Sequence, residues 1–358
     1  MRAIFLICGM QTELPPDCVP LMAWLEQNGV ESYPYRINGV FRLLSFNITL
    51  ERIVMKRILF LSVILCMCLT CGAAFGAHGH YVDGVEGINA GTAPPEGFYW
   101  RMYNLYYTAS QMKDNKGETP GDFKAHVYAM ANRFIYSTPI EILGGNLVVD
   151  AIVPLVYTDL YYKVGDNKIM DANRFGVGDI LVEPFVLSWH GERWDALAGV
   201  GVYMPSGGFR DPRSDFLRHA ADPGKGFWTF MGTLGGTVYM DAEKTWSASA
   251  LARYEIHTEQ SYTGTTPGND FHLEWGVGKT FDKIFTTGAA GYCNWQTTRD
   301  TGNLANRDQR ERGYAIGPEI GFVRPDWKFQ VSLRSLFEFK NRNAPQGITT
   351  ALVLTKAF

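Results

Sequence analysis

The sequence predicts an all-β protein: a transmembrane antiparallel up-and-down β-barrel of about 12 strands, preceded by a signal peptide. Three observations support this fold class. A signal-like segment begins at Met55, long stretches alternate apolar and polar residues, and the candidate strands are even in number. No apolar stretch after Leu69 reaches the ~20 residues that a membrane-spanning helix needs, so the sequence excludes a helical membrane protein.

The segment that begins at Met55 has the layout of a Sec signal peptide. Two basic residues follow the methionine, then an apolar run too short to span a bilayer, then small residues up to Ala77. We therefore expect residues 55–77 to be a signal peptide that is cleaved near Ala77. Residues 1–54 are then upstream sequence translated in error, and the alternative is that they form a real leading segment.

Cysteine usage agrees with this division. Of the six cysteines, only Cys293 lies beyond residue 77, and a mature chain with one thiol needs no disulfide framework. The cluster CMCLTC at residues 66–71 lies in the apolar run, where thiols act as small apolar groups. We expect neither a metal site nor lipidation there.

The expected mature chain, residues 78–358, is weakly acidic. The whole chain carries 33 basic and 36 acidic side chains, and the expected mature part keeps 27 basic and 31 acidic ones. This balance leaves no strongly basic surface, so we expect no nucleic-acid partner.

Alternation with a period of two identifies the strands. It is clear in WSASALARYEIHTE from Trp246 and recurs in FHLEWGVGK from Phe271 and WKFQVSLRSLFEFK from Trp327. These runs have the ~9 to 11 residues of a tilted strand that crosses a bilayer, rather than the ~5 to 6 of ordinary strands. Charged residues on the polar parity suit a water-filled lumen, so we expect the apolar parity to face lipid.

We expect an outer-membrane barrel over residues 97–358. Its strands are predicted at residues 97–108, 124–136, 146–159, 175–189, 194–204, 226–240, 246–260, 270–281, 284–299, 312–324, 327–339 and 348–358. Long connections after the first, third, fifth, seventh and ninth strands alternate with mostly short ones, as outside loops alternate with periplasmic turns.

Two of these strands carry further predictions. The fourth does not alternate cleanly, because Asp179 and Glu183 share a parity with Leu181, so we expect a bulge at residues 176–178 or at Pro184. The last strand ends on Phe358, which we interpret as the signal that the outer-membrane assembly machinery reads.

The segment before the first strand, residues 78–96, is rich in Gly and Pro and predicts irregular structure. It is expected either to fold into the lumen as a hatch or to lie in the periplasm. His78 and His80 could bind a metal adventitiously, but we expect no functional metal.

Ionisable residues on the polar parity are the candidate lumen residues. They are Arg253, Glu255, His257, His272, Glu274, Glu319, Arg334 and Glu338. They would form a charge-paired constriction that solutes contact, or would pair with each other across the barrel and hold its shape. Thr229, Thr233 and Thr237 predict a mild polar strip, and no motif indicates a catalytic centre or a cofactor.

Six motifs occur in order along the expected mature chain. They are PPEGFY from Pro94, FGVGD from Phe175, YMPSG from Tyr203, DFHLEWGVGK from Asp270, AIGPEIGF from Ala315 and EFKNRNAPQG from Glu338. Together they resemble the outer-membrane transporter family named for the meta pathway of phenol degradation, over about residues 80–358. Ser206 stands where that family more usually has Thr, and the closing motif contains extra residues.

The resemblance implies a passive channel in the outer membrane of a Gram-negative bacterium, surrounded by lipid and lipopolysaccharide. Its solutes would be small hydrophobic or aromatic compounds, and no cofactor is implied. A barrel of 12 strands lies between small barrels filled by side chains and 16-stranded porins with an aqueous channel. Such a bore would pass a small solute.

The alternatives are a general porin, a structural or adhesive barrel, and an outer-membrane lipase. An adhesive barrel would use the loop at residues 205–225, with Arg210, Arg213, Arg218 and His219 as its contact surface. A lipase needs a nucleophile and a base at hydrogen-bond distance. The sequence has no His-x-Ser pair, and Ser188 and His190 have the reversed spacing, so we expect no enzyme.

Overall fold

The structure, a computed structural model, describes residues 79–211, 220–302 and 310–358. The predicted leading segment, residues 1–54, and the predicted signal peptide, residues 55–77, lie outside the described residues. So do His78 and three of the four loop residues singled out above, Arg213, Arg218 and His219. In the described ranges, no helix is both long and apolar enough to cross a membrane.

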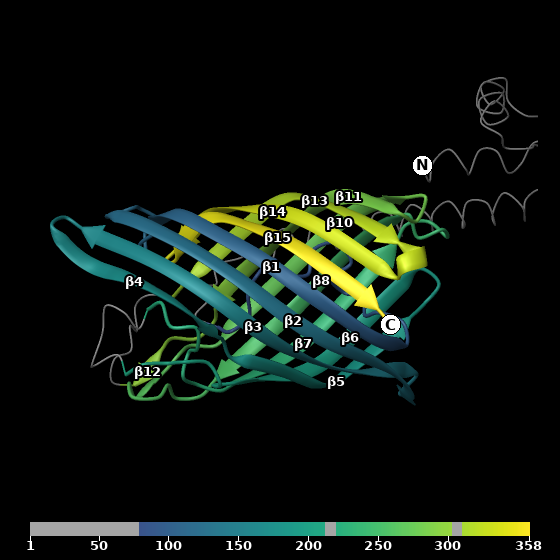
Figure 1. Ribbon diagram of the computed structural model, residues 1–358, viewed down its shortest axis with the longest axis horizontal. Coiled ribbons are helices and arrows are strands. Elements are labelled where there is room, and N and C mark those ends of the chain that lie inside the picture. The colour runs from purple at the N-terminus through teal and green to yellow at the C-terminus, as the bar shows by residue number, and fades with distance from the viewer. Residues whose placement is uncertain (1–78, 212–219, 303–309) are drawn as a thin grey trace, which may run out of the picture. The chain divides into compact units, whose positions relative to one another are not determined.

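Within the described residues, 13 antiparallel strands form one sheet (Figure 1). They are β1 (Gly97–Met112), β2 (Asp122–Ile142), β3 (Gly145–Val164), β4 (Asn167–Val177), β5 (Ile180–His190), β6 (Trp194–Met204), β7 (Thr229–Tyr239), β8 (Trp246–His257), β10 (Asp270–Phe281), β11 (Phe285–Gln296), β13 (Arg312–Arg324), β14 (Phe329–Arg342) and β15 (Pro345–Ala357). Two short strands, β9 (Thr265–Thr266) and β12 (Thr301–Gly302), pair with each other, and Pro325–Trp327 forms one 3-10 turn.

The sheet closes into a barrel because β1 pairs with β2 on one side and with β15 on the other, while β2 also pairs with β3. β4 and β5 share one place in the wall: β4 pairs with β3 from Leu155 to Val164, and β5 pairs with β3 from Asn146 to Ile152. The barrel therefore has the 12 strand places that the sequence predicts, and the predicted fold class is confirmed.

The predicted fourth strand, residues 175–189, is wrong in its bounds. It joins the end of β4 to β5, which are separated by Gly178 and Asp179, and the register shifts again between Val182 and Phe185. The long loop expected after the third strand is instead a turn at residues 165–166. β4 was missed because KIMDANRFG does not alternate, although the backbone of β3 offers it a full ladder.

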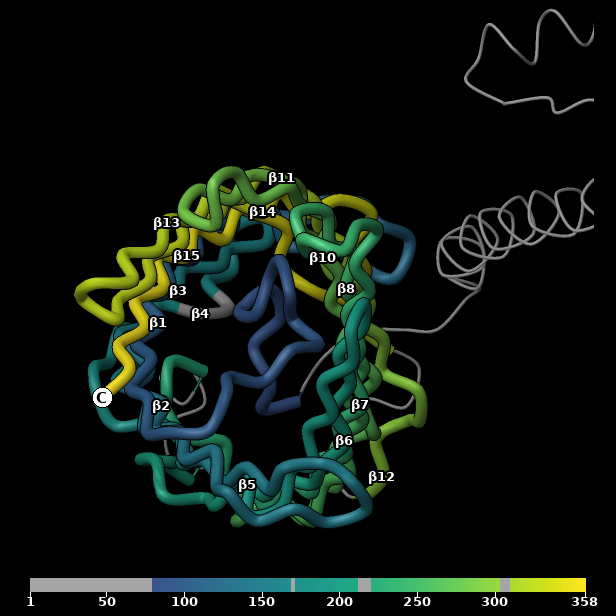
Figure 2. The backbone as a smooth tube through the Cα atoms, turned by 90° about the vertical axis from the view of Figure 1, so that its right-hand side faces the viewer, coloured from purple at the N-terminus to yellow at the C-terminus, as the bar shows by residue number. Residues whose placement is uncertain are grey.

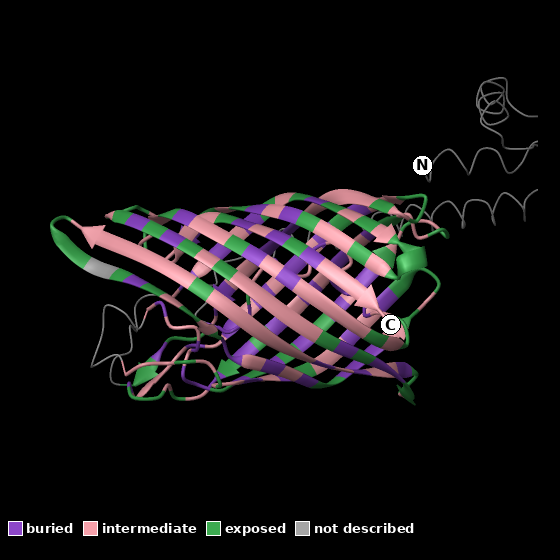
Figure 3. Cartoon of the chain, viewed as in Figure 1, coloured by how far each residue is buried: buried purple, intermediate pink, exposed green. Residues whose placement is uncertain are grey.

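Exposed and buried residues alternate along the wall, as Figure 3 shows. On β8, Trp246 and Tyr254 are exposed at its two ends, while Ser247 and Arg253 are buried. Exposed aromatic side chains near the short turns are Phe98, Trp194, Trp246, Phe281, Phe285, Trp327 and Phe358; those near the other end are Tyr106, Tyr128, Trp228, Phe230, Tyr254, Phe337 and Phe339. Exposed aliphatic residues between them include Val200, Leu234, Ile316, Leu333 and Leu352. Two aromatic girdles around an apolar band are the outer surface of a barrel in a bilayer.

Candidate functional site

Residues 79–96 run inside the ring of strands, as the view along the barrel shows (Figure 2); we call this segment the hatch. Its backbone turns tightly, with Ala90 N–H donating to Gly87 O at 3.2 Å. It also lies directly on the backbone of β7, because a Cβ on Gly91 would come within 2.3 Å of Gly236 main-chain atoms. Glycine on both sides permits this close approach.

Histidine and carboxylate side chains hold the first part of the hatch. His80 Nε2 lies 2.8 Å from Asp179 Oδ2, and His80 Nδ1 lies 2.7 Å from Thr229 Oγ1. Three residues later, Asp83 Oδ1 lies 2.9 Å from His272 Nδ1. The hatch is thus joined to the barrel by pairs of side chains, one from the hatch and one from the barrel in each pair.

Tyr81 makes three contacts with the neighbouring strands β8 and β10. Its backbone N–H donates to Glu255 Oε1 at 3.1 Å, its hydroxyl donates to Glu274, and the Arg253 guanidinium lies over its ring, 4.3 Å from the centroid. The ring therefore covers part of the ionisable surface of the lumen.

Glu86 is the charged centre of the hatch. Its Oε1 accepts from Arg133 Nη1 at 2.8 Å and from Tyr103 Oη at 3.0 Å, and its Oε2 accepts from Arg101 Nη1 at 3.1 Å. Burial alone would raise the pKa of Glu86, but the surrounding guanidinium groups lower it from 4.5 to about 2. The carboxylate is therefore ionised at physiological pH.

The next residues of the hatch contact β13 and β14. Glu319 Oε2 accepts from Ile88 N–H at 2.9 Å, and Arg334 Nη2 donates to Val85 O at 2.9 Å. Gly87, with φ +66°, lies so close that a Cβ would meet Arg334 Nη1 at 1.8 Å. A side chain at this position would force the ends of the Arg334 and Glu319 side chains to move.

All eight lumen candidates named from the sequence lie on the inner face, and the structure brings most of them to the hatch. The six that contact the hatch are Arg253, Glu255, His272, Glu274, Glu319 and Arg334. The other two pair with the wall: His257 with Asp270, and Glu338 with Tyr107 and Tyr292. Contact of any of these residues with a solute remains a prediction.

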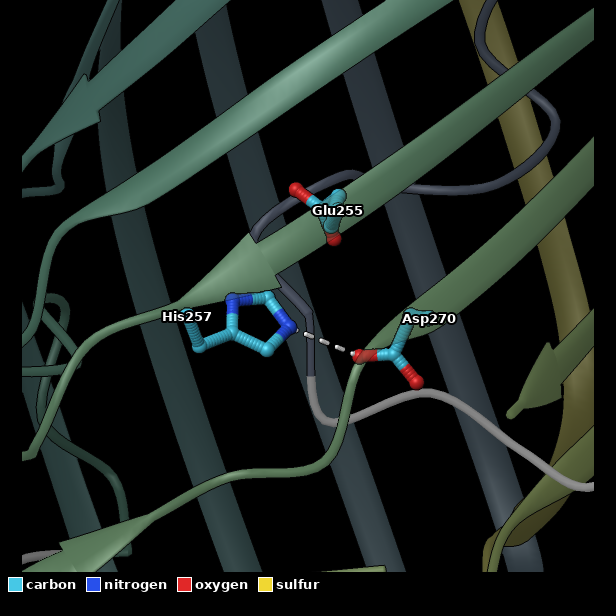
Figure 4. Close-up of side chains that lie close together, drawn as sticks. All are labelled: Glu255, His257 and Asp270. Atoms are coloured by element: carbon cyan, nitrogen blue, oxygen red, sulfur yellow. Dashed lines mark hydrogen bonds and ion pairs between the residues drawn. The ribbon is translucent and has the colours of Figure 1, made fainter. Parts of the chain in front are cut away.

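Glu255, His257 and Asp270 are a candidate cation site, because their ligand atoms lie within 4.8 Å of one another and all three are buried (Figure 4). His257 Nε2 lies 3.1 Å from Asp270 Oδ2. Glu255 already accepts from Tyr81 and pairs with His272 at 3.2 Å. Glu255 therefore anchors the hatch without an ion, and His257 pairs with Asp270, whose other oxygen, Oδ1, has no hydrogen-bond partner among the described residues.

Sequence reasoning missed the residues around Glu86. Arg133 is the main one: its guanidinium pairs with Asp150 at 2.8 Å and with Glu183 at 2.9 Å, as well as with Glu86. Arg133 and Asp150 each interrupt an otherwise apolar inner parity, on β2 and β3. Such an interruption on two adjacent strands is a signal that could have found them.

Ser188, His190 and Asp195 form a hydrogen-bonded chain near the other end of the hatch. Ser188 Oγ lies 2.9 Å from His190 Nε2, and His190 Nδ1 lies 3.1 Å from Asp195 Oδ1. However, Ser188 is only 1% exposed, so a substrate cannot reach its hydroxyl. Asp195 Oδ2 also accepts from Thr92 of the hatch at 3.0 Å, so the chain anchors the hatch here too.

Between the hatch and the wall lies a cavity of ≈ 40 Å³. This volume has room for about three water molecules. One side is apolar, where Ala90 and Ala93 of the hatch pack on wall residues Ile135, Val148, Val186, Leu197 and Leu251. The other side is charged and includes Glu86 and its arginine partners.

Acidification is expected to weaken the docking of the hatch at His80. Burial lowers the pKa of His80 below 6.5, although its hydrogen bond with Asp179 acts in the opposite direction. Docking therefore favours the neutral imidazole, so this contribution is complete above pH 6.5 and is lost as the pH falls through the lowered pKa. In planar bilayers we expect the conductance to rise below pH 6.5, and His80→Gln to remove that rise.

The comparison of His80→Gln with the unsubstituted chain isolates this residue from the other groups that face it, namely Asp179, Lys225, Glu255, Thr229, Tyr203 and Phe227. Glu86 does not contribute in this range, because its pKa is about 2. Identical pH profiles for the two proteins would contradict the prediction.

A closed wall with a lipid-facing apolar band, a polar interior and an internal hatch defines a transmembrane β-barrel of the outer-membrane type. More particularly, the chain belongs to the family described as "Putative MetA-pathway of phenol degradation", whose sequence profile matches residues 109–354. No curated protein matches the chain significantly by sequence.

A solved structure shows the same fold, and two others are less similar. An outer membrane channel from Pseudomonas putida F1 has a TM-score of 0.65 at 14% identity, over 78% of this chain and 100% of that chain. The transport unit of the autotransporter AIDA-I from Escherichia coli has a TM-score of 0.46 at 10% identity, over 78% and 94%. The β domain of the Bordetella autotransporter BrkA has a TM-score of 0.45 at 11% identity, over 74% and 100%.

Proposed function

We propose that this protein is a channel in the outer membrane of a Gram-negative bacterium, for passive uptake of small hydrophobic or aromatic compounds. Membership of the family and the likeness of the fold to an outer membrane channel support the location and the class. Outer-membrane lipid and lipopolysaccharide are then its surroundings. We also propose that the exposed side chain of Phe358, which follows β15, is recognised by the assembly machinery of that membrane.

One observation carries the proposed solute class: an apolar patch on the inner wall. Ile135, Val148, Val186 and Leu197 face the lumen, where a pore for ions or sugars would present polar side chains. The hatch covers this patch with the small side chains of Ala90 and Ala93. A solute that replaces these methyl groups must itself be apolar to keep the patch out of water.

The same observations disfavour the alternatives. A general porin needs an aqueous channel, whereas here the hatch runs inside the ring of strands and packs on the inner wall (Figure 2). A lipase needs an accessible nucleophile, and Ser188 is buried. We therefore propose a role that is not enzymatic and that requires no cofactor.

Uptake by whole cells tests this function. Cells with intact lipopolysaccharide, with and without this gene, would be given labelled toluene and, separately, a labelled sugar of similar size. Faster uptake of toluene alone is the expected result. Faster uptake of the sugar alone would indicate a general porin, and no change in either would indicate a structural barrel.

A further inference from the structure

Two residues that line the cavity beside the hatch each have a buried polar atom without a hydrogen-bond partner in the described part of the chain. These atoms are Thr233 Oγ1 and Arg253 Nε. Thr233 on β7 and Arg253 on β8 are also direct partners in the strand register, so the two side chains are neighbours on the inner wall. Unpaired buried polar groups are rare because each one loses its hydration without compensation.

The other Arg253 nitrogens have different roles. The guanidinium lies over the Tyr81 ring, and its Nη2 is 4.0 Å from Glu86 Oε1. Nε is thus a buried N–H donor without a partner, which a small polar group could satisfy. Thr233 Oγ1 is able both to donate and to accept.

With every ionisable side chain charged, the formal charges around the cavity balance. Three arginines line it, Arg101, Arg133 and Arg253, and so do three carboxylates, Glu86, Asp150 and Glu183. An anionic or cationic ligand would disturb this balance in a buried place, where an uncompensated charge is costly. The cavity therefore favours a neutral ligand.

We propose that Thr233 and Arg253 form a binding site for the hydroxyl group of a neutral, mostly apolar solute, such as an aromatic or aliphatic alcohol. The hydroxyl oxygen accepts from Arg253 Nε–H, and the hydroxyl proton is donated to Thr233 Oγ1. This inference rests on the proposed function and narrows its solute class.

The size of the cavity indicates where the two parts of the solute bind: the hydroxyl group in the cavity and the apolar body outside it. A volume of ≈ 40 Å³ accepts a hydroxyl group but not a ring. The apolar body takes the place of Ala90 and Ala93 when the hatch shifts, against the apolar patch described above. A pure hydrocarbon would leave both polar atoms unpaired, and a site built to bind a hydroxyl discriminates against an analogue that lacks it.

Paired probes test this site. Cells that express the full chain would be given naphthalene, 2-naphthol or 2-naphthoate, which share one ring system but differ in their polar group. The unsubstituted chain is expected to take up 2-naphthol faster than the other two. Thr233→Val removes the hydroxyl at nearly constant size and is expected to lower the ratio of 2-naphthol to naphthalene uptake by roughly fivefold, about the effect of one hydrogen bond.

Two further variants separate binding from structure. Thr233→Ser keeps the hydroxyl and is expected to keep the ratio. Thr237→Val is the matched control: Thr237 lies on the same face of β7, but its hydroxyl already pairs with Thr92 Oγ1 at 2.8 Å, so the ratio should not change. An altered mobility of the unheated protein on gels would reveal a barrel that has not closed.

The outcomes distinguish this inference from the proposed function. If naphthalene and 2-naphthol are both taken up, and the ratio of their uptake is the same in Thr233→Val and in the unsubstituted chain, the hydroxyl site alone is overturned. The cavity would then hold only water. If the gene increases the uptake of neither naphthalene nor 2-naphthol, the proposed function is overturned and this inference with it. Preferred uptake of 2-naphthoate would overturn the neutral character of the site.

Discussion

Removal of the hatch is expected to convert the barrel into an open pore. A variant that joins residue 78 directly to Glu96 keeps every strand and its ladder, because β1 begins at Gly97 and closes on β15 without help from the hatch. The wall charges that the hatch now covers would become hydrated, at little cost in a wet lumen. We expect the single-channel conductance in planar bilayers to rise on the order of tenfold, as the interior approaches that of a porin.

The unheated variant should still migrate on gels as a closed barrel, which serves as the control for folding. It should also pass a small sugar, which we expect the full chain to exclude. A closed barrel with unchanged conductance would show that some other part of the chain blocks the lumen.

Glu86→Gln is expected to release the hatch without deleting it. The substitution removes the charge that Arg101 and Arg133 share, and their guanidinium groups stay largely buried. Breaking a buried ion pair by removing one partner costs roughly 3–5 kcal/mol. The substitution therefore destabilises the docked hatch rather than the wall, because Arg133 keeps its ion pairs with Asp150 and Glu183. We expect Glu86→Gln to show most of the increase in conductance that removal of the hatch produces, measured in the same planar bilayers.

Glu96→Gln is the matched control for this variant. Glu96 belongs to the same segment but is exposed, and its carboxylate accepts one hydrogen bond from Asn146 Nδ2 at 3.2 Å. Its conductance should equal that of the unsubstituted chain. If Glu86→Gln were as closed as Glu96→Gln, the central ion pairs would not be what holds the hatch.

The depressed pKa of Glu86 adds a pH dependence to the same contact. A carboxyl group whose pKa falls from 4.5 to about 2 on docking stabilises the docked state fully above pH 4.5. That contribution is lost only as the pH falls toward 2. Loss at His80 begins below 6.5, so the two anchors release in different pH ranges.

The wall of the barrel was predictable because its physics is local. A strand with lipid on one side and a polar interior on the other must alternate, and β8 and β10 do so along most of their length. β4 was not predictable in the same way. Its residues do not alternate between apolar and polar. The break between β4 and β5 at Gly178 and Asp179 depends on how both strands pair with β3, and such pairing cannot be read from a short stretch of sequence.

The site was predictable only in part, for the opposite reason. The charged inner parity of β8 and β10 is visible in the sequence, so Arg253 and Glu274 could be named. The hatch has no periodicity, and its contacts join residues far apart in the chain, such as Val85 and Arg334. Whether a Gly-rich segment lies inside or outside a barrel is decided by such contacts.

The seam between β1 and β15 also constrains how the barrel can form. Tyr99 pairs with Ala357, and Phe98 O accepts from Phe358 N–H at 3.0 Å, so the closing ladder joins the start of the wall to its last residues. Contacts of such large sequence separation carry a high loop-closure entropy and slow folding. Until β15 pairs with it, β1 presents an unpaired edge to any other strand. The cylinder cannot close before β15 has paired with β1, so substitutions at this seam should alter the rate at which the barrel forms more than the properties of the closed barrel.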